Sequence, residues 1–191
     1  APHDDEFLQL HARNYPGGEF AEHVFTYMKV KDILRFTGPL GSFFLRDATE
    51  NTSIIFLASG TGFAPIKSIL EHIFHQENAR NNKTKMTLYW GARTRADLYL
   101  ADLADNWQQQ HKNFTFVPVL SEPLPTDNWE GRTGLVHEAI MQDFSSLEKH
   151  QVYACGAPAM VKAAYYDFTK SRDLPTDAFF SDVFVPSISN L

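Results

Sequence analysis

A strand that runs into a glycine-rich turn and then a helix is the feature that most restricts how this chain folds. The apolar run Ser53–Ala58 has the length and composition of a strand buried on both faces. After it come Gly60-Thr61-Gly62-Phe63-Ala64-Pro65 and apolar residues with helical spacing over 65–75. Glycines let backbone approach phosphate groups closely, and a helix start offers unpaired N–H groups. The junction therefore predicts a dinucleotide pyrophosphate site; the alternative is a tight turn that binds nothing.

The sequence after this junction continues to alternate between strands and helices. Further strands are expected at 86–90, 114–120, 151–155 and 178–180, and helices at 98–110, 135–144 and 158–169. Repeated units of this kind form a parallel sheet with helices on both faces. We therefore predict an α/β fold built on a doubly wound parallel sheet.

Residues 1–46 have a different pattern, with short strands joined by turns. Strands are expected at 7–12, 33–37 and 42–45, a short helix at 20–28, and turns at 15–18 and 38–41. This is too little β structure to close a barrel, so the region is expected to be the last part of one. Because the polar stretch 47–52 reads as a linker, we predict two domains, at 1–46 and 47–191.

Composition excludes several classes of function. The net charge is −6, and no Lys/Arg cluster offers the basic surface that nucleic acids need. The single cysteine excludes an intrachain disulfide and a Cys-based iron–sulfur or zinc site, and the eight histidines lack metal-ligand spacing, so no metal site is expected. No apolar run approaches the roughly 20 residues of a membrane span, and the first residues do not show the pattern of a signal peptide. A cytoplasmic location is expected.

A second strand-to-helix junction is Tyr153-Ala154-Cys155-Gly156-Ala157-Pro158. Ligands bind at the carboxyl ends of parallel strands, so Cys155, Gly156, Ala157 and Pro158 are expected at the same crevice, with Cys155 close to a nicotinamide. The alternative for Cys155 is a small buried thiol that ends a strand. Thr133-Gly134, before another predicted helix, either borders the crevice or forms a simple turn.

The end of the second strand differs from that of common dehydrogenases. It reads Trp90-Gly91-Ala92-Arg93, without the acidic residue that takes a ribose 2′-hydroxyl, and Pro65 replaces the third glycine of the usual fingerprint. Gly91, Arg93 and Arg95 are therefore candidates to lie near the ribose or its 2′-phosphate. The alternative for each arginine is a solvated surface charge. The choice between NADH and NADPH stays open.

Taken together and in order, these motifs resemble the ferredoxin–NADP reductase-like flavoprotein superfamily. The resemblance rests on the two junctions, on 89–93 and on Asp97-Leu98-Tyr99; in addition, Gly38-Pro39-Leu40-Gly41-Ser42-Phe43 resembles the segment that ends the family's flavin barrel. The resemblance extends over nearly the whole chain. It is strongest to NAD(P)H-flavin reductases and to hexulose-dehydrase reductases.

The resemblance implies a hydride transfer from NADH or NADPH to the flavin of FAD, followed by electron transfer to a ferredoxin-like 2Fe–2S domain, another acceptor protein or free flavin. It implies that the 60–65 turn holds the pyrophosphate and that Cys155 and Gly156 border the nicotinamide. The aromatic tail at 179–184 would place Phe184 near the isoalloxazine ring; the alternative for such aromatics is a core or interface role.

The flavin motifs depart from the family pattern. The first, Arg-x-Tyr-Ser/Thr, is absent, and the second is present as Gly17-Gly18-Glu19-Phe20-Ala21, in which Ala21 cannot donate a hydroxyl hydrogen bond. The chain is therefore expected to be a fragment of a longer reductase. One alternative is a nucleotide-binding module that lacks its own flavin and docks on an electron-transfer protein. Another is a non-enzymatic scaffold.

Overall fold

Strand β1 (Ser53–Ser59) is central in a parallel sheet because it is apolar on both faces and helices cover both. The computed structural model describes residues 3, 6–38, 40–47, 52–80 and 84–184. Within them the strand order is β4-β3-β2-β1-β5-β6, with every neighbouring pair parallel. The other strands are β2 (Met86–Ala92), β3 (Phe114–Leu120), β4 (Arg132–Thr133), β5 (His150–Gly156) and β6 (Phe179–Val183). The predicted doubly wound α/β fold is confirmed.

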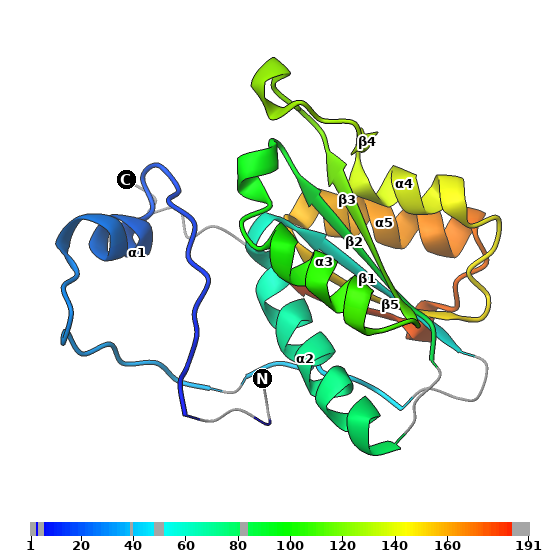
Figure 1. Ribbon diagram of the computed structural model, residues 1–191, viewed down its shortest axis with the longest axis horizontal. Coiled ribbons are helices and arrows are strands. Elements are labelled where there is room, and N and C mark those ends of the chain that lie inside the picture. Colours follow the sequence, from blue (N-terminus) through cyan, green and yellow to red (C-terminus); the bar gives the residue numbers. More distant parts are fainter. Residues whose placement is uncertain (1–2, 4–5, 39, 48–51, 81–83, 185–191) are drawn as a thin grey trace.

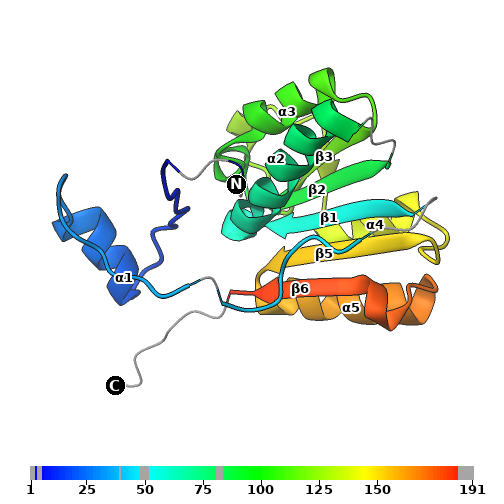
Figure 2. The ribbon, with the colours of Figure 1, turned by 90° about the horizontal axis from the view of Figure 1, so that it is seen from below.

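Helices cover both faces of the sheet (Figure 2), and an apolar cluster lies between the sheet and the helices on each side. Helices α2 (Phe63–Arg80) and α3 (Ala101–Gln110) pack on one face, and α4 (Val136–Asp143) and α5 (Pro158–Ser171) on the other. Successive strand residues alternate between these clusters, so that Phe56 joins the α2 side and Leu57 the α4–α5 side. Both side chains are fully buried.

The predicted N-terminal strands at 7–12, 33–37 and 42–45 are wrong: none is formed in the described residues. A strand needs a neighbour that accepts and donates backbone hydrogen bonds, and no described segment pairs with these residues. Large apolar side chains of this region, including Phe7, Ile33 and Phe36, are exposed instead. The predicted helix at 20–28 is formed as α1 (Glu19–Glu22) and a π-helical turn (His23–Tyr27). Pro39 and residues 48–51 of the predicted linker lie outside the described residues.

The N-terminal segment with α1 lies to one side of the sheet, beyond the carboxyl ends of its strands and apart from the main body (Figures 1 and 2). It is attached near its start by His11, whose Nδ1 lies 2.6 Å from the hydroxyl of Tyr99. It is attached again near its end, where Phe43 and Leu45 pack against the α2-side core. Among the described residues, no helix combines the length and apolarity that crossing a bilayer requires.

Candidate functional site

A cleft of about 1450 Å³ lies at the carboxyl edge of the sheet. Its walls come from the turns that follow β1, β2, β3 and β5, from the start of α4 and from N-terminal residues 11–21. Parallel strands direct their carboxyl ends to one edge, which is why residues far apart in sequence meet here. The structure thus brings together most of the predicted site residues, namely Gly17, Gly18, Gly60, Thr61, Gly91, Arg93, Gly156, Ala157 and Phe184.

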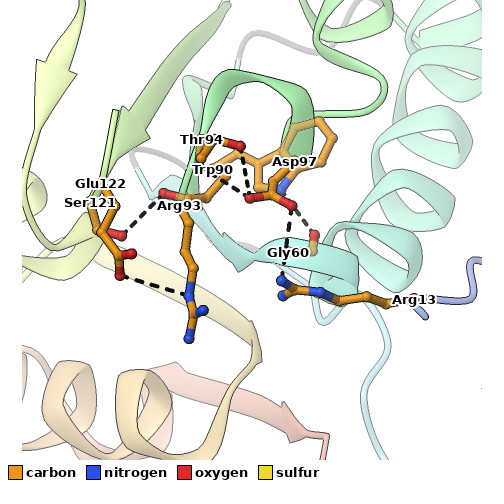
Figure 3. Close-up of polar contacts among 9 residues, drawn as sticks. Arg13, Gly60, Trp90, Arg93, Thr94, Asp97, Ser121 and Glu122 are labelled. Carbon is orange, nitrogen blue, oxygen red and sulfur yellow. Dashed lines mark hydrogen bonds and ion pairs between the residues drawn. The ribbon is translucent and has the colours of Figure 1, made fainter. Parts of the chain in front are cut away.

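The first glycine turn, at 60–62, forms one wall of the cleft. Gly60 has φ +53°, a conformation that favours glycine, and its carbonyl accepts a hydrogen bond of 3.0 Å from Trp90 Nε1 (Figure 3). Phe63 is fully buried and stacks on Trp90 with ring centroids 3.9 Å apart. Trp90 and Phe63 therefore support the turn on its core side. Gly60 and Thr61 face the cleft, just before the long helix α2. Gly62, Phe63, Ala64 and Pro65 do not line the cleft; of these, Gly62 and Phe63 are buried and anchor the turn to the core.

The second glycine turn follows β5 and packs against the first. Gly156 has φ +135°, and a side chain there would overlap Ser59. Ser59 Oγ accepts a hydrogen bond of 3.0 Å from the Ala157 N–H, and the Gly156 carbonyl accepts one of 3.0 Å from the Phe184 N–H. The two turns and the tail therefore form one continuous floor. Pro158 begins α5 and lies outside the lining.

Cys155 is fully buried in the α2-side core and does not line the cleft. Burial, with a smaller contribution from the charge of Asp182, raises the pKa of its thiol to about 12. The group is therefore a protonated thiol at neutral pH. The neighbouring Gly156 forms the cleft surface at this point instead.

The two candidate arginines after β2 lie in different surroundings. Arg93 lines the cleft, and its Nε lies 3.8 Å from a carboxylate oxygen of Glu122 (Figure 3). Arg95 lies outside the cleft, where its backbone N–H and its guanidinium donate to Asp127 at 3.3 and 3.2 Å. Gly91 lies against Val136: a methyl group on Gly91 would come within 2.7 Å of the Val136 Cβ. Arg93 alone of these two arginines is placed to meet a ligand.

Arg13 is a cleft residue that the sequence did not reveal. Its Nη2 lies 3.9 Å from Asp97 Oδ1, while Asp97 Oδ2 accepts hydrogen bonds of 3.1 Å from the N–H and hydroxyl of Thr94 (Figure 3). Its Nη1 lies 3.8 Å from the position that a Cβ on Gly60 would take. A cation therefore stands beside the first glycine turn. Nothing in the pattern around Arg13 marks it, because its place depends on how an irregular segment runs past the carboxyl ends of strands that are distant from it in sequence.

The second flavin motif also lies at the cleft, but it is incomplete. Gly17 has φ +77°, and the Gly18 N–H donates to the Tyr15 carbonyl at 3.0 Å, which forms a tight turn before α1. Ala21 is buried and supplies no hydroxyl. The described residues form no barrel strand beside this turn. The described residues also contain no group of three His, Cys, Asp or Glu side chains that could hold a metal ion.

Comparison with known proteins identifies the family. Residues 56–165 match the family described as "Oxidoreductase NAD-binding domain". This chain belongs to that oxidoreductase family. The match spans both glycine turns, all of β5 and β1 from Phe56 onward. The predicted resemblance to ferredoxin reductase-like flavoproteins is confirmed.

Three relatives illustrate the similarity. The chain is 40% identical over 187 residues to the CDP-6-deoxy-L-threo-D-glycero-4-hexulose-3-dehydrase reductase of Yersinia pestis, covering 98% of this chain and 54% of that protein. It is 31% identical over 179 residues to the reductase component of a phenol 2-monooxygenase from Pseudomonas, covering 93% and 49%. The crystal structure of the reductase GcoB from Amycolatopsis has a TM-score of 0.81 at 30% identity, covering 93% and 52%. The chain thus spans about half the length of the relatives it matches.

Proposed function

We propose that this chain is the NAD(P)H-binding part of a flavin-dependent reductase. Residues 47–191 would form the nucleotide-binding domain, and residues 1–46 would end a flavin-binding barrel. The observation that carries this proposal is the cleft at the sheet edge, whose floor is two glycine turns packed backbone against backbone. Membership in a family of NAD-binding oxidoreductases supports it.

The diphosphate of the nucleotide would bind at Gly60 and Thr61. The helical turn Gly60–Gly62 continues into α2, so the positive end of the helix dipole lies there, and the first N–H groups of this turn would donate to the phosphate oxygens. Arg13 adds a full positive charge beside the same turn. A negatively charged diphosphate would therefore meet donors from the sheet and from the N-terminal segment together.

The adenosine ribose would lie near Arg93 and Ser121, at the far wall. Both line the cleft, and Glu122 lies beside Arg93. A carboxylate accepts a hydrogen bond from a ribose 2′-hydroxyl but repels a 2′-phosphate. The Glu122 carboxylate also balances the charge of Arg93. These contacts favour NADH over NADPH.

The nicotinamide would lie over the second glycine turn, against Gly156, Ala157 and the partly exposed Phe184. A flavin, when bound in the intact protein, would take the hydride of the nicotinamide and pass electrons on. The role of this chain is placement: fixing the nicotinamide converts a rare encounter into a nearly unimolecular step. The acceptor would be a 2Fe–2S domain or another partner protein, as expected for a reductase component.

A blocking substitution tests the nucleotide site. Ala157 is exposed and lines the cleft, so Ala157→Trp fills the cleft without entering the core. We expect the wild type to bind NADH in a calorimetric titration and Ala157→Trp to lose that binding. Gln109→Trp, on the exposed face of α3, controls for an added indole and should bind as the wild type does. A wild type that binds neither NADH nor NADPH would refute the proposal.

The second candidate is a nucleotide-binding module without its own flavin. The buried Ala21 and the absence of described barrel strands favour it. Purified protein that binds NADH but shows no oxidised-flavin absorbance would support this function. A yellow protein with bound FAD would support the flavoenzyme instead.

A further inference from the structure

Ser59 ends β1 and directly precedes the helical turn Gly60–Gly62, but its side chain does not cap this turn. A serine at such a position commonly accepts a hydrogen bond from an N–H group two or three residues further on. The Ser59 hydroxyl instead accepts one of 3.0 Å from the Ala157 N–H, in the second glycine turn. Ser59 therefore joins the two turns and leaves the first N–H groups of its own turn without a side-chain cap.

The Ser59 hydroxyl lies at the boundary between the two glycine turns. Ser59 is partly exposed, and it lines the cleft together with the turn residues Gly60, Gly156 and Ala157. A Cβ on Gly156 would overlap the Ser59 hydroxyl oxygen and would lie 2.7 Å from the Ser59 carbonyl oxygen. Glycine at position 156 is thus what leaves room for this hydroxyl between the turns.

The hydrogen of the Ser59 hydroxyl is available to a ligand. A serine hydroxyl donates one hydrogen bond and accepts others, and the Ala157 N–H uses only an acceptor position of Ser59 Oγ. Among the described residues, no protein atom accepts the hydrogen of this hydroxyl. Ser121, which also lines the cleft, differs because its hydroxyl donates to the Ala92 carbonyl at 3.4 Å. Ser59 therefore presents a hydrogen-bond donor to whatever occupies the cleft.

The covalent order of a pyridine nucleotide determines which of its groups passes Ser59. In the proposed binding mode the diphosphate lies at the first glycine turn and the nicotinamide lies over the second. Ser59 directly precedes the first turn in the sequence, and its side chain is hydrogen-bonded to the second. The ribose that links the diphosphate to the nicotinamide has to span the same gap. Its hydroxyl oxygens are hydrogen-bond acceptors and so match the donor of Ser59.

We propose that Ser59 is a ligand-binding residue, whose hydroxyl donates a hydrogen bond to the ribose next to the nicotinamide. The inference rests on the proposed function and extends it to a group of the nucleotide that no other residue has been given to hold. Ser59 then has two tasks: its oxygen joins the two turns, and its hydrogen holds the ribose. Fixing this ribose limits the freedom of the attached nicotinamide ring above the second turn.

Three ligands together test which group the hydroxyl meets. NADH and ADP-ribose contain the ribose beyond the diphosphate, whereas ADP lacks it. We expect Ser59→Ala to weaken NADH and ADP-ribose about five-fold each in calorimetric titrations, as for one neutral hydrogen bond, and to leave the affinity for ADP unchanged. Ser181→Ala, at an exposed position of β6 outside the cleft, is the matched control and should leave all three affinities unchanged.

The outcomes separate this inference from the proposed function. Equal losses of ADP and NADH affinity in Ser59→Ala would overturn the inference, because the substitution would then act on the first turn or on the diphosphate. Unchanged affinities for all three ligands, or a loss for NADH alone, would overturn it as well. Each of these results leaves the proposed function standing. A wild type that binds neither NADH nor NADPH refutes the proposed function, and the inference falls with it.

Discussion

Gly62 packs directly against the carbonyl group of Cys155, so that a methyl group on Gly62 would overlap this carbonyl and the Gly156 Cα. The neighbours are backbone atoms, which cannot rotate away as a side chain does. The two glycine turns of the cleft therefore behave as one piece. A substitution that displaces one turn should also displace the other.

Gly62→Ala should consequently lower the free energy of unfolding by about 1–3 kcal/mol, the usual cost of overpacking. It should also weaken NADH binding, because the turns must separate to admit the methyl group. Gly38→Ala is the control, since its Cβ would meet only the Leu40 nitrogen at 3.9 Å. Urea unfolding followed by circular dichroism gives the stabilities. Equal midpoints for the two variants would contradict the packing described.

Glu122→Gln should shift nucleotide preference towards NADPH. It removes the carboxylate that repels a 2′-phosphate and leaves Arg93 free to pair with it. Both side chains are about two-thirds exposed, so we expect a gain of about five-fold in the ratio of NADPH to NADH affinity, as for a solvent-screened pair. Titrations with both nucleotides measure this ratio. Glu148→Gln, an exposed acidic residue outside the cleft, should leave the ratio unchanged.

Arg13→Gln should weaken NADH and ADP-ribose alike, because both ligands carry the diphosphate. A loss of roughly ten-fold is expected at low ionic strength, and it should shrink as salt screens the exposed charge. Arg35→Gln removes an exposed arginine that does not line the cleft and serves as the control. Loss of NADH affinity without loss of ADP-ribose affinity would show that Arg13 meets another part of the nucleotide.

The Cys155 thiol should not react in the native protein at pH 8. Its folded pKa of about 12 exceeds the ordinary value of 9.0, so the folded state binds the thiol proton more tightly. The resulting stability is complete below pH 9 and is lost as the pH rises towards 12. Titration with an aromatic disulfide should find no thiol in native protein and one in guanidinium. Unfolding free energies between pH 8 and 10.5 should fall less steeply in Cys155→Ala than in the wild type.

Much of the sheet followed from the sequence because its signals are local. The apolar run of β1, the helical spacing in α2 and the proline at the start of α5 each depend on neighbouring residues alone. Strand β4 is not predicted, because two residues are too few to show the alternation of apolar and polar side chains that marks a strand. The N-terminal strands are predicted wrongly. The residue types at 33–37 favour extended structure, but a strand also needs a neighbouring strand for its backbone hydrogen bonds, and the described residues supply none.

The site was predictable where glycine was required and less so where side chains meet across the fold. Gly60 and Gly156 can be recognised from the sequence, because the residue type itself indicates a turn that favours glycine. The contact of Arg13 with the first turn depends on the path of the chain over more than forty residues, which no local pattern records. Cys155 was expected to face the crevice, but strand alternation places its side chain with that of Tyr153 in the α2-side core.

The hydrogen bond from Trp90 to Gly60 gives the molecule a built-in optical reporter. Of the three tryptophans, Trp90 is the one whose indole donates to the turn that lines the cleft. Its emission overlaps the absorption band of a reduced nicotinamide, so occupancy of the cleft would quench it by energy transfer. Ligand binding could then be followed in the unlabelled protein, in real time.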